Sequence, residues 1–101
     1  MNYPVFGTKF TFDMDKIKEL GYDYDKMQEA IDKKADEIGL RKISENIYEA
    51  DADTFSLGKI GTLTMDYLLE QKWFCNSVKE WYVLKNQVIC GDFIADGALR
   101  I

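Results

Sequence analysis

Residues 24–38 carry the pattern that most restricts how this chain can fold. At about 100° per residue, five side chains fall within roughly 80° of arc, as on the buried face of an amphipathic helix: Tyr24, Met27, Ile31, Ala35 and Ile38. Asp23 or Asp25 can cap the amino end of this helix, and Gly39 can end it. The sequence therefore predicts a helix over residues 24–38 that needs a second layer against one face.

The chain before this helix predicts a strand and a short helix. Residues 5–13 alternate with the period of a half-buried strand, which places four side chains on one side: Phe6, Thr8, Phe10 and Phe12. Residues 13–21 then match a helix that is capped by Asp13 and stopped by Gly21. Its expected apolar face consists of Met14, Ile17 and Leu20.

Two pairs of short strands are expected after the helix. Residues 40–43 and 47–50 predict two strands around a polar turn, with a single irregular strand as the alternative. Residues 78–84 and 88–94 are rich in β-branched and aromatic side chains around a turn, which indicates a β-hairpin. Residues 95–101 can add a last segment at the edge of the sheet.

A third helix is expected over residues 65–74. Gly58 and Gly61 loosen the stretch before it, and Thr64 is the expected cap. Its buried face would hold Met65, Leu68, Leu69 and Trp73. The element order is β-α-α-β-β-α-β-β, which predicts an α+β fold with helices packed on a largely antiparallel sheet. The chain has 101 residues and no linker-like stretch, so residues 1–101 are expected to form a single domain.

Acidic residues are concentrated in the first half of the chain. Residues 1–53 contain 13 Asp and Glu against 8 Lys and Arg, whereas residues 54–101 contain five of each. The formal net charge of −5 therefore lies entirely in the first half. Phosphate backbones are bound through Lys and Arg, so we expect no direct binding to nucleic acid and favour a basic protein surface as the partner.

Four carboxylates line up on the solvent side of the predicted helix, at spacings of four, three and four residues: Asp25, Glu29, Asp32 and Asp36. Like charges four residues apart cost a few tenths of a kcal/mol, so helix stability does not account for this row. Lys26 and Lys33 lie along its neighbouring edge, and Glu29 is oriented to pair with Lys33. The row is either an ordinary solvated face or a contact surface for a basic partner. With about one charge per 5 Å, it is too sparse to imitate duplex DNA.

Trp73 and Trp81, with their neighbours Phe74 and Tyr82, form the densest aromatic patch of the sequence. Helix and strand spacing favours core packing for both tryptophans. Trp is also a frequent anchor of protein interfaces. A tryptophan that is exposed beside the acids would therefore be a candidate binding residue.

Patterns typical of catalysis or of metal binding are incomplete. The chain has no His, which excludes His-based triads and His-ligated metal sites. Asp13, Asp23 and Asp51 each open an Asp-x-Asp sequence, but the later positions of a calcium loop hold unsuitable residues, so we interpret these acids as caps and turns. Residues 58–61 have the GxxG spacing of KH domains, which is a weak match, and we interpret them as a bend. We expect no metal site, no cofactor and no enzyme activity.

Cys75 and Cys90 are too few for a disulfide framework. We expect both to be reduced thiols packed in the core. The first nine residues have no basic segment before an apolar stretch, so we expect no secretory signal. No apolar run approaches the ~20 residues that cross a bilayer. The sequence therefore favours a cytoplasmic protein that is not bound to a membrane.

Our leading hypothesis is a small acidic binding protein that occludes a basic surface, as immunity proteins, antitoxins and phage or mobile-element inhibitors of nucleases do. The acid row, Trp73 and Trp81 are its candidate contact residues. The alternative is a structural or accessory module without catalytic activity, which forms a homodimer through an exposed edge strand such as residues 88–94.

Overall fold

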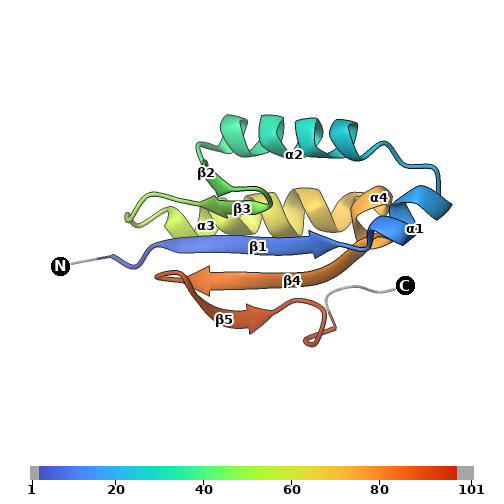
Figure 1. The fold of residues 1–101 in the computed structure, drawn as a ribbon. Helices are drawn as coiled ribbons and strands as arrows, with labels where there is room; N and C mark the ends of the chain where they lie inside the picture. Colours follow the sequence, from blue (N-terminus) through green and yellow to red (C-terminus); the bar gives the residue numbers. More distant parts are fainter. Residues whose placement is uncertain (1–2, 98–101) are drawn as a thin grey trace.

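The strand β1 (Phe6–Phe12) runs through the middle of a five-stranded antiparallel sheet with the order β2-β3-β1-β4-β5 (Figure 1). The computed structural model describes residues 3–97. Thr8, Phe10 and Phe12 are buried and Lys9 is exposed, so the predicted alternation is confirmed. Because β1 has a neighbour on each side, this alternating segment is the centre of the sheet.

Two hairpins supply the other strands. They are β2 (Arg41–Ser44) with β3 (Ile47–Glu49), and β4 (Val78–Lys85) with β5 (Val88–Asp92). The region after the long helix thus forms two short strands rather than one irregular strand. In the second hairpin Asn86 and Gln87 have φ values of 51° and 69°, as a two-residue type I′ turn requires. This hairpin leaves β5 at one edge of the sheet.

The helices and the sheet enclose one hydrophobic core, which includes Phe10, Ile31, Leu63, Phe74 and Trp81. The helical segments are α1 (Met14–Glu19), α2 (Tyr24–Ile38), α3 (Ser56–Gly61), the π-helical η1 (Thr62–Tyr67), the short 3-10 segment η2 (Leu68–Glu70) and α4 (Lys72–Cys75). Figure 1 shows α2 beside β2 and β3, and the α3 segment running along the sheet. The predicted α+β fold and its element order are confirmed, and the described residues form one domain.

Helix α2 has the predicted bounds. The carboxylate of Asp23 accepts a hydrogen bond from the backbone N–H of Lys26 at 3.2 Å, and Gly39 ends the helix with a φ of 95°. That left-handed conformation strains any residue with a side chain, which explains the glycine. Met27, Ile31 and Ala35 are buried along the predicted stripe. These contacts fix which sides of α2 face solvent.

Helix α1 differs from its prediction in packing. Asp13 caps it as predicted, accepting from the backbone N–H of Lys16. Of the expected apolar face only Ile17 is buried, whereas Met14 and Leu20 are exposed. The helix has only six residues and lies beyond the end of β1 (Figure 1), so a single turn reaches the core.

The predicted helix over residues 65–74 was wrong at its start. The helical segment begins at Ser56, and Gly58 and Gly61 lie inside it; the GxxG stretch is therefore helical rather than a bend. Each glycine costs a helix about 1 kcal/mol. Burying a side chain such as Ile60 or Leu63 contributes about 1.5–3 kcal/mol, so tertiary packing outweighs the local penalty.

The buried face of this segment was also predicted wrongly in part. Thr64 is a buried interior residue whose hydroxyl donates to the carbonyl of Ile60 at 2.8 Å, not a cap. Met65 is 44% exposed, whereas Leu63 and Leu68 are completely buried. The wider π-helical turn of η1 shifts the phase of the side chains that follow it. A break at Gln71 then separates η2 from α4.

The chain after β5 forms turns over residues 93–97. The Asp92 carboxylate accepts from the backbone N–H groups of Ile94 and Ala95, which ends the strand. The predicted edge segment over 95–101 is therefore wrong for residues 95–97, and its remainder lies outside the described residues. Within residues 3–97, no helix combines the length and the apolar character that crossing a membrane requires.

The two cysteines differ in environment. Cys75 is partly buried, and burial raises the pKa of its thiol. Cys90 is exposed on β5, so the expectation of a core position was wrong for this residue. Its strand lies at the edge of the sheet, and residues 88–90 are all exposed, which alternation alone could not indicate. Both cysteines are free thiols.

Candidate protein-binding site

The acid row lies along one flank of α2, between the buried stripe and the solvent-facing ridge of the helix. Asp25, Glu29 and Asp36 are exposed, and Asp32 is partly buried. Within residues 3–97, the carboxylates of Asp25, Glu29 and Asp36 accept no hydrogen bond and form no ion pair. The helical backbone thus presents three free carboxylates to solvent.

Asp32 is held by the sheet. The hydroxyl of Tyr48 on β3 donates to one carboxylate oxygen of Asp32 at 2.5 Å, and Lys42 Nζ on β2 lies 3.0 Å from the same carboxylate. Tyr48 is completely buried. Burial, and then the neighbouring Asp32, raise the pKa of Tyr48 well above its ordinary value, so the hydroxyl keeps its proton and remains a donor. Asp32 is therefore an anchor of α2 rather than a free charge.

A fifth carboxylate approaches the same flank from the turn between β2 and β3. Tyr24, at the start of α2, donates its hydroxyl hydrogen to Glu45 at 2.5 Å. Asn46 of the same turn accepts from the Gln28 side-chain amide at 2.6 Å. Glu45 is exposed, so it extends the negative surface beyond the helix. Sequence reasoning missed Glu45 because only the folded chain brings this turn beside Tyr24.

The lysines of α2 are placed differently from the prediction. Within residues 3–97, no ion pair joins Glu29 to Lys33; Lys34 instead lies 3.7 Å from Glu37. Lys33 lines a hollow on the other flank of the helix. The acid row and this hollow therefore lie on different sides of the solvent-facing ridge.

Trp81 belongs to the core. It is completely buried, with its ring centroid 4.9 Å from that of Phe74 and 4.3 Å from that of Phe93. Contact with a partner depends on exposure, which this residue lacks. The prediction that Trp81 could anchor an interface is therefore corrected to a role in core packing.

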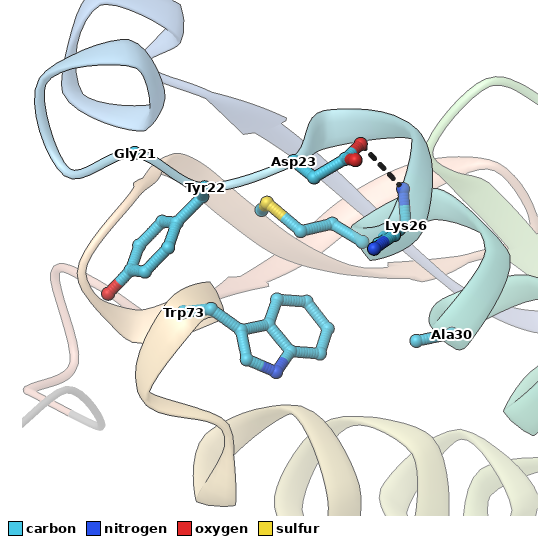
Figure 2. A pocket seen from close by; sticks show the side chains of 7 residues that line it. Gly21, Tyr22, Asp23, Lys26, Ala30 and Trp73 are labelled. Atoms are coloured by element: carbon cyan, nitrogen blue, oxygen red, sulfur yellow. Dashed lines mark hydrogen bonds between the residues drawn. The ribbon is translucent and has the colours of Figure 1, made fainter.

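Trp73 is partly exposed and lines a hollow of about 320 Å³. Figure 2 shows Trp73 and Tyr22 facing Lys26 and Ala30 of α2 across this hollow. The hollow lies on the lysine flank of α2, whereas the acid row lies on the flank from which Asp32 contacts β2 and β3. The structure thus separates Trp73 from the four carboxylates with which it was grouped.

The Asp-x-Asp sequences serve local structure. Asp13 and Asp23 cap α1 and α2, Asp51 pairs with Arg41, and Asp53 accepts from the backbone N–H of Phe55 at 2.8 Å. Across residues 3–97, no cluster of three or more Asp, Glu or Cys side chains has the geometry to hold a metal ion.

No protein-family model matches this chain, and no curated protein matches its sequence. The functional assignment therefore rests on the geometry of α2 and its neighbours.

Proposed function

We propose that the protein binds a basic surface of another protein, such as a nuclease or toxin, and occludes it. The observation that carries this proposal is the line of free carboxylates on α2, namely Asp25, Glu29 and Asp36. Within the described residues none of the three has an ion-pair partner. At about 1.5 Å per residue they span roughly 17 Å, a length that suits a patch of Lys and Arg side chains.

The anchoring of α2 supports this role. Met27, Ile31 and Ala35 pack the helix into the core, and Asp32 ties it to Tyr48 and Lys42. A preformed surface loses little conformational entropy on binding, so more of the electrostatic attraction appears as affinity. The side-chain carboxylates need only small rotamer changes to meet a basic partner.

The net charge of −5 supports the same role through kinetics. Opposite charges steer two proteins toward each other and raise the association rate, and salt weakens this effect. The same negative charge disfavours direct binding to nucleic acid. A cytoplasmic location is part of the proposal, because the free thiols Cys75 and Cys90 suit a reducing compartment.

The test uses three versions of the protein as bait to capture binding proteins from a lysate of the cells that encode this chain. The first is the wild type, and the second carries Asp25→Asn, Glu29→Gln and Asp36→Asn. The control, which loses the same charge elsewhere, carries Asp15→Asn, Asp66→Asn and Glu70→Gln. We expect the wild type and the control to retain one or a few basic proteins that the acid-row variant loses.

Calorimetry and activity assays then measure occlusion. We expect the acid-row variant to bind the captured protein at least about tenfold more weakly than the control does, and to inhibit its activity correspondingly less. Capture of no basic protein, or equal affinity of the two variants, contradicts the proposal. Because both variants lose three negative charges, the comparison distinguishes the effect of where the charges lie from the effect of the net charge.

The second candidate is a homodimer through the edge strand β5. Its support is the exposure of Val88 and Ile89, which are 68% and 52% exposed at an edge of the sheet. Exposed apolar residues on an edge strand favour pairing with other strands. Analytical ultracentrifugation tests it: a dimer that survives dilution and becomes a monomer on Ile89→Lys supports this role, and a wild-type monomer excludes it.

A further inference from the structure

The lysine flank of α2 borders two hollows that meet at Ala30. The hollow at Trp73 and Tyr22 has a volume of about 320 Å³, and the neighbouring hollow at Tyr67 has a volume of about 360 Å³. Ala30 lines both of them. Both hollows lie beside α2, one bordered by Trp73 of α4 and the other by Tyr67 of η1, and we call the two together the α2–η1 groove.

The charge of this groove is opposite to that of the acid row. Its α2 side carries Lys26 at one hollow and Lys33 and Lys34 at the other. The two carboxylates of the groove are already engaged: Asp23 caps α2, and Glu37 lies 3.7 Å from Lys34. Among the described residues, Lys26 and Lys33 have no ion-pair partner. The groove therefore offers two free ammonium groups.

Aromatic side chains form the other wall of the groove. The Tyr22 hydroxyl accepts a hydrogen bond from the Asn76 side-chain amide at 3.2 Å, which fixes one side of the hollow. Trp73 packs edge to face on the buried Phe74, with ring centroids 6.4 Å apart. Figure 2 shows both aromatic rings at the border of the open space. A volume of about 320 Å³ is at the lower end for small-molecule pockets, and suits one bulky side chain.

We propose that the α2–η1 groove binds an acidic segment of a protein partner. A bulky apolar side chain of that segment occupies the hollow at Trp73, and its carboxylates pair with Lys26 and Lys33. These lysines are seven residues apart, or about 10 Å along the helix, so the matching carboxylates lie about two helical turns apart. This surface lies across the ridge of α2 from the acid row, and its occupant has the opposite charge to the partner proposed above.

A protein segment fits this groove better than a nucleic acid. Phosphate backbones are bound by extended tracks of cations, whereas this groove has two free lysines and two carboxylates on its border. The acid row on the same helix repels a polyanion that extends past the ridge. A peptide can place a few carboxylates at the lysines and no charge near Glu37 or the acid row.

The test selects ligands from a displayed library of random 16-residue peptides on the full-length protein. The groove variant carries Lys26→Glu and Lys33→Glu, and the matched control carries Lys79→Glu and Lys85→Glu, two exposed lysines of β4. We expect the wild type and the control to enrich acidic peptides with one Trp, Phe or Leu anchor. We expect these peptides to bind the groove variant at least about tenfold more weakly.

A second variant keeps the charge and removes the space. Ala30→Gln fills the space beside Ala30, leaves the charge unchanged and keeps a good helix former. We expect it to weaken the selected peptides at least about tenfold while circular dichroism shows an unchanged fold. Retained binding would mean that the lysines attract peptides without a groove, which overturns the proposal.

The remaining outcomes are also decisive. Enrichment of no peptide, or of peptides without acidic residues, overturns the proposal. A fluorescein-labelled 20-nucleotide oligo(dT) probe tests the nucleic-acid alternative by anisotropy; binding that is lost in the groove variant overturns the proposal in favour of nucleic acid. The acid-row variant should bind the selected peptides at least as well as the wild type, so the two proposed surfaces fail or succeed separately.

Discussion

The buried hydroxyl of Tyr48 donates a hydrogen bond to Asp32, and so joins the second strand of the first hairpin to the middle of α2. The contact spans 16 residues of sequence. It engages one carboxylate of the acid row and leaves the other three without partners among the described residues. The stability of the fold therefore depends on Asp32, whereas the proposed binding depends on the other three carboxylates of the row.

Replacing Tyr48 with Phe should destabilise the protein. The change removes a hydrogen bond to a charged group, and Asp32 keeps only Lys42 and water, so we expect a loss of about 1–2 kcal/mol in the free energy of unfolding. Urea unfolding measures it. Tyr82→Phe is the control, because its hydroxyl bonds to Glu80 at the surface; we expect a change within about 0.5 kcal/mol. Equal losses in the two variants would contradict the prediction.

The two acids Asp32 and Asp36 should respond differently to neutralisation. Asp32→Asn weakens the contacts with Tyr48 and Lys42, so we expect the free energy of unfolding to fall by about 1 kcal/mol or more. Asp36→Asn removes a negative charge that lies four residues from Asp32. We therefore expect the free energy of unfolding to stay unchanged or to rise by a few tenths of a kcal/mol. Thermal and urea unfolding check both. An equal effect would mean that Asp32 is an ordinary surface carboxylate.

Stability should fall at alkaline pH because of Tyr48. Burial, assisted by Asp32, raises its pKa above the ordinary value of 10.0. Above about pH 10 the unfolded chain releases this proton while the native protein keeps it. The free energy of unfolding then falls by up to about 1.4 kcal/mol per pH unit for this group.

Urea unfolding between pH 8 and pH 11.5, in steps of about half a unit, measures this dependence. Tyr48→Phe should give a shallower decline over the same interval. Tyr24, Tyr67 and Cys75, whose pKa values are also raised by burial, contribute to the decline that remains. Tyr82, whose pKa is raised by its hydrogen bond to Glu80, contributes as well. Identical slopes for wild type and variant would exclude Tyr48 as the cause.

Gly58→Ala and Gly61→Ala should each stabilise the protein. Both glycines lie in α3 with open space around an added Cβ, so alanine gains helix propensity of about 0.5–1 kcal/mol. Gly39→Ala is the opposing control, because its φ of 95° strains any side chain, and we expect a loss of about 1 kcal/mol. Destabilisation by both α3 changes would argue that the helix begins after them, as the sequence alone suggested.

The sequence predicted best where local signals agree. The bounds of α2 follow from one apolar stripe, the Asp23 cap and the terminal Gly39, and all three act within the segment. Helix α3 was missed because its glycines and its uncapped start are unfavourable locally. Its stability comes from burying Ile60, and Leu63 of the adjoining η1, in a core that includes residues of distant strands, which no local pattern contains.

The candidate site was predicted only in part. The acid row was correctly placed on the helix, but the anchoring of Asp32 depends on Tyr48 and Lys42 from the following hairpin. The two tryptophans looked equivalent in sequence. Their difference arises because Trp81 lies on an inner strand beneath the helices, while Trp73 lies on the short α4 at the border of a groove.

The separation of charge across α2 gives the helix a dipole perpendicular to its axis, in addition to the dipole along it. The basic partner proposed above would turn the carboxylates toward itself and the free lysines away before the two molecules touch. The two molecules would then be oriented before contact, so that a larger fraction of their encounters leads to a complex. This orientation would leave the α2–η1 groove open to solvent when the basic partner covers the acid row.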